Sequence, residues 1–187
     1  MGYFNAIPDE NIWLDHVFKF IIDIILVVLF ALLLIHFFGY DIKATGNSME
    51  DTFKYVNVLL LDLFDYQVSN PKQYDVIAFD EDPNTEGVQL NIKRIIAGPD
   101  DSIIIKNGEI YVNDKKLKIT EGKNAIVNAG FAKDELTLGP DEYFVIGDNW
   151  NNSEDSRFPN VGNVNKSQII GKVYLRVAPF AKIGLVS

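Results

Sequence analysis

The sequence predicts a mainly β protein, an antiparallel β-sheet domain preceded by a single N-terminal transmembrane α-helix. Three observations support this fold class. One long apolar run lies near the N-terminus, from Phe20 to Phe38. After Tyr55 the chain breaks into short apolar or alternating segments separated by turn residues, a pattern typical of half-buried strands. Beyond the apolar run, the sequence has no long amphipathic helix pattern.

The apolar run is interrupted only by Asp23 and His36. Its length is close to the roughly 20 residues that cross a bilayer core. A cleaved signal peptide is the alternative, but the run is long for one and is neither preceded by a basic region nor followed by an Ala-x-Ala site. We expect a short N-terminal segment at 1–16, a transmembrane anchor at 17–39 and a β-rich domain at 40–187. The charges beside the span do not predict its orientation.

The expected strands are short and rich in branched or aromatic residues. They are Val56 to Phe64, Asp75 to Phe79, Val88 to Ile96, Ser102 to Lys106, Glu109 to Val112, Tyr143 to Ile146 and Ile169 to Val177. Asn107-Gly108 is a strong hairpin signal, because both turn positions tolerate positive φ. Asn113-Asp114 predicts a second turn. Loops are expected near Asn84, Asn124 and Asn151.

The composition excludes several kinds of chemistry. The chain has no cysteine, which removes thiol nucleophiles, thiolate metal sites and disulfides. Its two histidines, His16 and His36, flank or lie in the apolar run, so the β domain holds neither a Ser-His-Asp triad nor a histidine zinc site. A net charge of −9 argues against a nucleic-acid partner. A hydrolytic site in this domain would therefore need Lys, Tyr, Asp or Glu as its base.

Two segments suggest a serine nucleophile with a lysine base. Ser48 lies in a turn-like stretch just after the apolar run, and Lys93 emerges among isoleucines on an expected strand. Serine needs an adjacent base, and burial can lower the pKa of a lysine enough for it to serve as one. By strand alternation Lys93 and Ile95 face one side, and Arg94 faces the other, where it can meet a carboxylate. On these segments alone, an ordinary turn serine and an exposed Lys-Arg pair remain open alternatives.

A third polar cluster, Gly147 to Arg157, directly follows an apolar strand. A surface loop and a calcium loop are the alternatives to a functional role. An EF-hand loop needs Gly at its sixth position and Glu at its twelfth. Counted from Asp148, those positions hold Ser153 and Pro159, so the calcium loop is excluded.

Together the three segments resemble the type I signal peptidases in their short Gram-positive-like form. The family's Ser-Met-x-Pro-Thr motif stands here as Ser48-Met49-Glu50-Asp51-Thr52, and its lysine motif resembles Lys93 to Asp101. The pattern Gly-Asp-Asn-x-x-x-Ser-x-Asp-Ser-Arg matches Gly147 to Arg157, and Tyr174 to Gly184 looks like the family's C-terminus.

The resemblance implies a β-sheet catalytic domain of the signal peptidase type. It implies a membrane-bound serine endopeptidase that cuts secretory preproteins after a small-x-small site, on the extracytoplasmic face. No metal and no cofactor are implied.

The resemblance also implies residue roles. Ser48 would be the nucleophile and contribute its backbone N–H to the oxyanion hole, and Lys93 would be the general base. Ser153 would hydrogen-bond and orient the Lys93 amine. The expected supporting pairs are Asp148 with Arg94 and Asp155 with Arg157. The residues expected to line the pocket for the small P1 side chain are Met49, Phe53 and Ile92.

The chain departs from the family pattern at Asp51, which replaces a proline, and at Ala97, Asp100 and Trp150. A carboxylate at Asp51 near the lysine would raise the lysine pKa and oppose its role as base. The departures predict an active but divergent peptidase with a narrow substrate set such as pilins. The alternatives are a non-catalytic signal-peptidase-like accessory protein in pilus assembly and a self-cleaving Ser/Lys regulator. The presence of both dyad residues favours the enzyme.

Overall fold

A computed structural model describes residues 12–38, 40–44, 46–53, 57–81, 89–120 and 124–186. The chain divides into two compact units, Met1–Phe37 and Phe38–Ser187. The first contains a long helix, and the second contains the β-sheets and all the candidate site residues.

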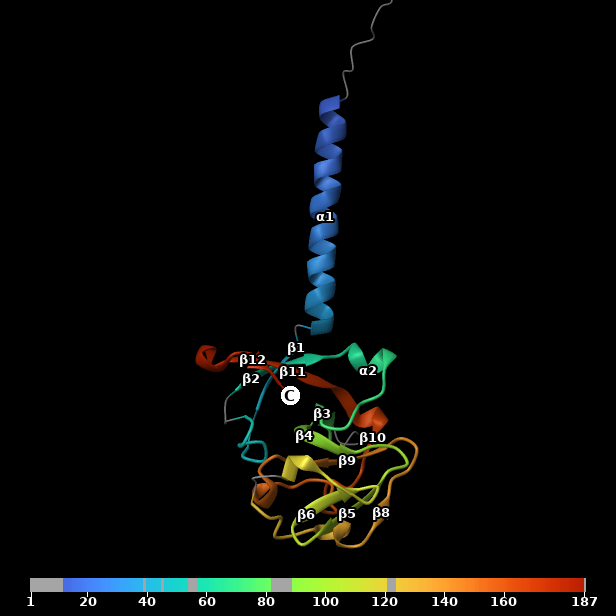
Figure 1. The fold of residues 1–187 in the computed structure, drawn as a ribbon. Coiled ribbons are helices and arrows are strands. Elements are labelled where there is room, and N and C mark those ends of the chain that lie inside the picture. Colours follow the sequence, from blue (N-terminus) through green and yellow to red (C-terminus); the bar gives the residue numbers. More distant parts are fainter. Residues whose placement is uncertain are drawn as a thin grey trace, which may run out of the picture. The chain divides into compact units, whose positions relative to one another are not determined.

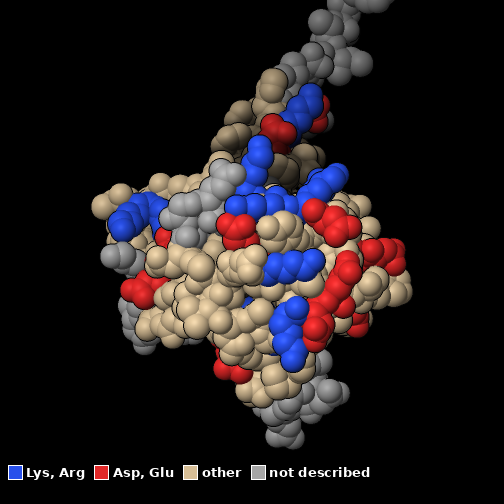
Figure 2. Space-filling view, turned by 60° about the horizontal axis from the view of Figure 1, so that its bottom comes forward, with Lys and Arg blue, Asp and Glu red and all other residues tan. Residues whose placement is uncertain are grey.

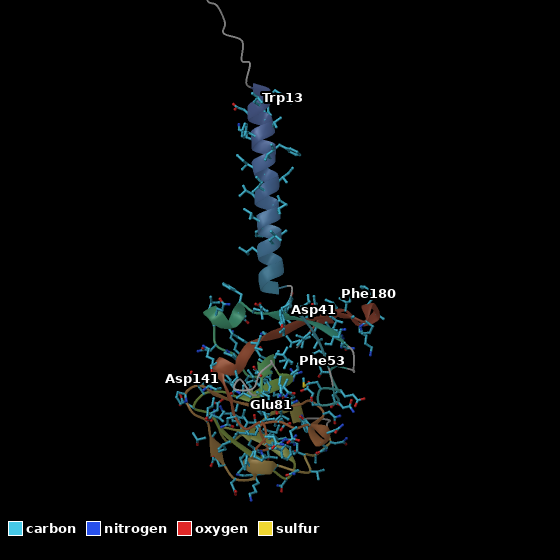
Figure 3. The ribbon with its side chains drawn as sticks, turned by 180° about the vertical axis from the view of Figure 1, so that it is seen from behind. Trp13, Asp41, Phe53, Glu81, Asp141 and Phe180 are labelled. Carbon is cyan, nitrogen blue, oxygen red and sulfur yellow. The ribbon has the colours of Figure 1, made fainter. Side chains whose placement is uncertain are left out.

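The helix α1 covers Ile12–Phe38. Its stretch Trp13–Leu33 is long and apolar enough to cross a membrane, with a mean hydropathy of 2.5, and none of it is buried within the structure. Side chains point outward all round this helix (Figure 3), and an apolar surface on every side suits a helix surrounded by lipid. The helix begins before the predicted anchor at 17–39, whose exact limits in a bilayer stay a prediction.

The larger sheet of the second unit has eight antiparallel strands in the order β1-β2-β11-β3-β4-β9-β10, with β12 paired to β11. Figure 1 shows these strands in the part of the chain that follows α1. The strands are β1 Tyr40–Lys43, β2 Val58–Asp62, β3 Val76–Asp80, β4 Leu90–Ala97, β9 Glu142–Ile146, β10 Val164–Asn165, β11 Ile169–Ala178 and β12 Gly184–Leu185. β4 lies between β3 and β9, and Ile77 of β3 stands opposite Lys93, so the predicted lysine is on an inner strand and not at the edge of the sheet.

A smaller antiparallel sheet has the order β7-β6-β5-β8. Its strands are β5 Ser102–Lys106, β6 Glu109–Val112, β7 Lys115–Lys116 and β8 Leu136–Thr137. Both predicted turns are confirmed, since Asn107 and Gly108 have φ of 54° and 78°, and Asn113 and Asp114 have φ of 50° and 62°. Two consecutive positive φ values give the turn twist that suits a two-residue hairpin.

The remaining elements are short. They are α2 Asp65–Val68, η1 Lys118–Thr120, η2 Gly130–Lys133, η3 Trp150–Asn152, η4 Lys166–Gln168 and η5 Phe180–Lys182. Asn124 lies outside any strand and Asn151 lies in η3, as expected for loop positions. Asn84 lies outside the described residues.

One apolar cluster combines strands of the smaller sheet with β4 and β9 of the larger sheet, and the larger sheet contributes to two further clusters. One of these combines Met49 and Phe53, just after Ser48, with Leu59 and Leu61 of β2 and Val76 of β3. Met49 and Phe53 are 5% and 2% exposed. The apolar side chains that flank the predicted nucleophile therefore anchor its turn to the core.

On the face shown in Figure 2, basic and acidic side chains lie beside one another across the surface. On the smaller sheet, the exposed side chains of Lys116 and Glu109 form an ion pair with Nζ and Oε1 2.7 Å apart. Exposed pairs of this kind contribute little to stability.

The seven predicted strands are all present, with described bounds within two residues of the expected ones. Val56 and Val88, which open two of them, lie outside the described residues. The sequence did not predict β1, β7, β8, β10 and β12, which have two to four residues each. Segments this short contain too few residues for an alternating pattern, and they become strands by pairing with a longer neighbour.

Candidate active site

Ser48 lies in a tight turn between β1 and β2. The turn is closed by backbone hydrogen bonds from Glu50 N–H to the carbonyl of Asn47 (3.1 Å) and from Thr52 N–H to the carbonyl of Met49 (2.9 Å). Its other side is held by Asn149, whose backbone N–H donates to the carbonyl of Ser48 at 2.9 Å. The serine is thus fixed between the core and the Gly147–Arg157 loop.

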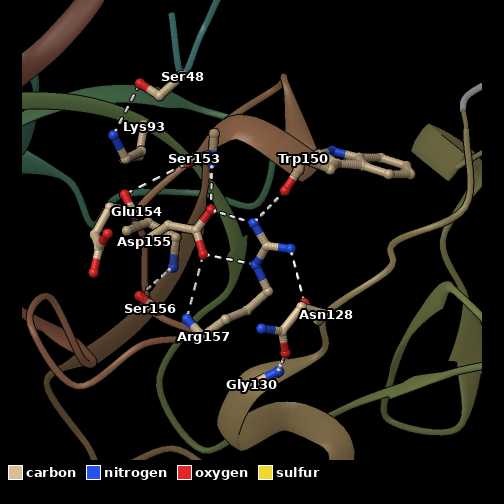
Figure 4. A network of polar contacts seen from close by, with 12 residues as sticks. Ser48, Lys93, Asn128, Gly130, Trp150, Ser153, Glu154, Asp155, Ser156 and Arg157 are labelled. Carbon is tan, nitrogen blue, oxygen red and sulfur yellow. Dashed lines mark hydrogen bonds and ion pairs between the residues drawn. The ribbon is translucent and has the colours of Figure 1, made fainter. Parts of the chain in front are cut away.

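Lys93 lies on β4 and is 2% exposed. Its Nζ lies 3.0 Å from Ser48 Oγ (Figure 4), a distance suited to proton transfer. A second hydrogen bond runs from Nζ to Asn91 Oδ1 at 3.4 Å. The structure therefore brings the two predicted dyad residues together across 45 positions of sequence.

Burial lowers the pKa of Lys93 from the ordinary value of 10.5, because the ammonium form loses hydration. The carboxylates of Asp155, Glu81 and Glu154 oppose this shift, and burial outweighs them. Asp51 is not among these carboxylates. The carboxylates that raise the lysine pKa here come from Glu81, directly after β3, and from the Gly147–Arg157 loop.

Asp148 joins the lysine strand to the nucleophile turn. Arg94 donates to it through Nε and Nη2, each at 2.8 Å, and both side chains are buried. The Thr52 hydroxyl donates to the same carboxylate. The predicted Arg94–Asp148 pair is confirmed as a two-pronged contact, the strong geometry for guanidinium and carboxylate. Thr52 was not among the predicted site residues, although it closes the Ser48 motif.

The second predicted pair is also present. Arg157 Nε lies 2.7 Å from Asp155 Oδ1, and the two residues are 1% and 0% exposed. Arg157 Nη2 also donates to the carbonyl of Trp150 at 2.6 Å (Figure 4). Asp155 in turn accepts from the backbone N–H of Gly147 at 3.1 Å. The pair therefore ties together the two ends of the loop that holds Ser48.

The predicted hydrogen bond between Ser153 and Lys93 is not formed among the described residues. Ser153 Oγ instead donates to the carbonyl of Glu154 at 3.5 Å, a long and weak contact. The second partner of the amine is Asn91, two residues before Lys93 on β4. Residues two apart on a strand share a face, so Asn91 reaches the amine without help from another element.

A cleft of about 410 Å³ opens beside Ser48. It is bounded by β1, the nucleophile turn and the start of β4. Met49, Phe53 and Ile92, the three predicted pocket residues, all line it. Among the residues that the structure describes, no group of three or more His, Asp or Glu side chains is arranged to hold a metal ion.

A buried lysine bonded to a serine hydroxyl at the wall of an open cleft is the arrangement that a serine hydrolase with a lysine base requires. The comparisons with known proteins agree. The chain belongs to the family described as signal peptidase, peptidase S26, which matches residues 17–178.

Three curated relatives carry signal peptidase names. Signal peptidase I of Bacillus caldolyticus is 33% identical over 149 residues, which cover 72% of this chain and 77% of that protein. Signal peptidase IB of Staphylococcus aureus is 31% identical over 159 residues, 76% and 78% of the two chains. A probable signal peptidase I-2 of a Synechocystis strain is 26% identical over 183 residues, 96% and 80% of the two chains. The protein is a membrane-associated serine endopeptidase that removes signal peptides from secretory preproteins, and the accessory alternative is not favoured.

Proposed function

We propose that Ser48 Oγ attacks the carbonyl carbon of the last residue of the signal peptide while neutral Lys93 takes its proton. The 3.0 Å contact between Lys93 Nζ and Ser48 Oγ is the observation that carries this proposal. The lysine ammonium then gives its proton to the leaving amine, and an ester to Ser48 remains. A water molecule that loses its proton to Lys93 hydrolyses this ester and frees the serine.

The backbone N–H of Ser48 is the proposed oxyanion donor. Donors of this kind typically contribute about 2.7–4 kcal/mol to the transition state. The close packing of the Gly147 backbone and Asn149 against Ser48 supports this role, because a donor acts best when it is already held in place.

The cleft beside Ser48 is proposed to hold the small P1 side chain. Buried Met49 and Phe53 and the partly buried Ile92 present apolar walls close to the nucleophile. Along the cleft, β1 is the edge strand of the described sheet. An extended peptide can add to such an edge through main-chain hydrogen bonds. This mode of binding suits a substrate whose cleavage site is defined only by two small side chains.

The deciding experiment is cleavage of a preprotein with an Ala-x-Ala site by the lipid-reconstituted enzyme. Wild type should cut at that site, whereas Lys93→Ala and Ser48→Ala should retain the fold and cut nothing. Appreciable cleavage by either variant would rule out the dyad. Absence of cleavage by wild type, with binding retained, would favour the accessory alternative.

We also propose that the catalytic domain faces the extracytoplasmic side, where the cleavage sites of secretory preproteins emerge. The chain has no cysteine, so single cysteines can report the topology. Asp134→Cys, at an exposed position, should react with a membrane-impermeant maleimide in intact cells. Glu10→Cys, which precedes the span in the sequence, should react only after lysis. The reverse pattern would refute this orientation.

A narrow substrate set such as pilins is the finer proposal. Its support is Asp51, which is exposed in the turn of Ser48 and stands where the related motif has proline. Wild type should then cut a pilin preprotein faster than a general preprotein, and Asp51→Pro should reduce the difference. Equal rates for both substrates with wild type would contradict the narrow set.

A further inference from the structure

We propose that Asn91 is the positioning residue of the general base, holding the Lys93 amine toward Ser48, and that Glu81 fixes the orientation of the Asn91 amide. This inference rests on the proposed Ser48/Lys93 mechanism.

A neutral lysine amine has two N–H bonds and one lone pair. To accept the serine proton, the lone pair must point at Ser48 Oγ. The amine ends a flexible stem, so rotation about its last bond would turn the lone pair away. An acceptor that binds one N–H restricts this rotation. Asn91 Oδ1 is such an acceptor, at a distance of 3.4 Å from Lys93 Nζ that is long for a hydrogen bond.

The location of Asn91 is compatible with this role. It lies two residues before Lys93 on β4 and pairs with Phe79 of β3, so its side chain and that of Lys93 share a face. Asn91 also lines the cleft that contains Ser48. Ser153, the residue expected to bind the amine, is bonded instead to the carbonyl of Glu154.

Glu81, directly after β3, determines which end of the Asn91 amide faces the lysine. Asn91 Nδ2 donates to the Glu81 carboxylate, and an ionised carboxylate only accepts hydrogen bonds. The reversed amide would place its oxygen against the carboxylate and its NH₂ group against the lysine donors. The first contact would be repulsive and the second would offer the amine a donor in place of an acceptor, so Glu81 keeps Oδ1 directed at Nζ.

The charges around the amine make a neutral acceptor useful. Carboxylates reach Lys93 from two elements, Glu81 after β3 and Glu154 and Asp155 in the loop after β9. Arg94, the neighbouring cation on β4, is bound to Asp148. A fourth negative charge would further favour the ammonium form. An amide oxygen provides the same hydrogen bond without that charge.

Four variants test the inference, each measured for kcat and KM against pH with lipid-reconstituted enzyme and an Ala-x-Ala preprotein. Asn91→Leu removes the acceptor at similar size. Asn91→Asp keeps an acceptor and adds a charge, and Glu81→Gln keeps an acceptor for Asn91 and removes a charge. The matched control is Asn163→Leu, which breaks the amide–carboxylate contact of Asn163 Nδ2 with Glu142 Oε2 (2.9 Å), remote in sequence from the dyad.

The alkaline plateau of kcat separates positioning from titration, because Lys93 is neutral there in every variant. Asn91→Leu should lower the plateau by about tenfold or more, as expected for a misaligned base. Asn91→Asp should move the rise of kcat to higher pH. Glu81→Gln should move it to lower pH and also lower the plateau, because a glutamine can accept from or donate to the amide and no longer fixes its orientation. Asn163→Leu should match wild type in both respects.

Asn91→Leu with a wild-type plateau would overturn the inference, as would a change in KM alone, which would assign Asn91 to substrate contact. If Asn91→Leu does not fold, unshifted pH profiles in both Asn91→Asp and Glu81→Gln would overturn it as well. Lys93→Ala is measured in parallel. Activity in that variant refutes the dyad itself, whereas an inactive Lys93→Ala beside a fully active Asn91→Leu refutes only the role of Asn91.

Discussion

Lys93 is almost fully buried and yet has three carboxylates acting on it. Burial favours the neutral amine and the carboxylates favour the ammonium ion. The pKa is lowered from its ordinary value because burial is the larger effect. At the scale of single residues, the chemistry of this site is therefore set by the difference between two opposing influences.

The activity should rise with pH as Lys93 loses its proton. The rise should be complete at a lower pH than an exposed lysine would require, since burial lowers the pKa below 10.5. Measuring kcat from pH 5 to 9 with a reconstituted preprotein tests this, with an independent fold check at each pH. A flat profile would contradict a lysine base.

The same burial should make the charged form of Lys93 lower the free energy of unfolding. A lysine whose folded-state pKa is lowered loses its proton on folding when the pH lies between that pKa and the ordinary value of 10.5, and below the lowered pKa it stays charged while buried. Wild-type stability should therefore rise, relative to Lys93→Met, as pH increases from the lowered pKa toward 10.5. Urea unfolding of both proteins between pH 6 and 10 measures the difference. A difference that does not vary with pH would show that burial does not perturb the amine.

At the scale of elements, the catalytic turn depends on a very close approach of two backbones. A Cβ atom on Gly147 would lie 2.5 Å from the carbonyl oxygen of Ser48 and 2.3 Å from Ser153 Oγ. Because glycine has no side chain, the backbone at the end of β9 can lie directly against the nucleophile turn.

Gly147→Ala should therefore displace Ser48 and reduce kcat by about 100-fold, the effect expected of a misplacement near 1 Å. Gly184→Ala is the matched control, because a Cβ atom there would meet nothing within 4 Å. The test is the cleavage rate of each variant compared with that of wild type, and Gly184→Ala should cleave at the wild-type rate. Wild-type activity in Gly147→Ala would mean that the turn tolerates movement.

The loop after β9 depends on the buried pair of Asp155 and Arg157. Arg157→Met should lower the free energy of unfolding by about 3–5 kcal/mol, because it leaves a buried carboxylate without its partner. Lys116→Met, which removes the exposed ion pair with Glu109, should change it by about 1 kcal/mol or less. Urea denaturation compares the two. Equal changes in the free energy of unfolding would indicate that the buried pair stabilises the fold no more than the exposed pair does.

At the scale of the whole molecule, the two units have different roles. The apolar stretch of α1 is unburied within the structure, whereas the second unit contains its own apolar clusters. Deletion of residues 1–37 should therefore abolish membrane sedimentation and leave the unfolding midpoint of the β domain nearly unchanged. Carbonate extraction and thermal unfolding measure these two quantities. A strongly lowered midpoint would show that the domain needs the helix to fold.

Much of the fold was predictable because its signals are local. The apolar run, the alternating segments and the turns at Asn107-Gly108 and Asn113-Asp114 depend on neighbouring residues alone. The short edge strand β1, which lines the cleft, was missed because four residues contain little pattern of their own. At the site, the pairs of Arg94 with Asp148 and of Asp155 with Arg157 were predicted, but their link through Thr52 to the nucleophile turn was not.

The sequence by itself determined that this protein has a membrane-length helix, a β-rich domain without cysteine or histidine, and a serine and a lysine able to form a dyad. Only the tertiary structure decided that Asn91, and not Ser153, binds the lysine amine. The physical reason is that residue type and periodicity limit which chemistry is available to a chain. Asn91 and Lys93 share a face of one strand, but the direction of the lysine amine and the distance of Ser153 from it depend on how β4 packs against the Ser48 turn and the loop after β9, segments that are distant in sequence.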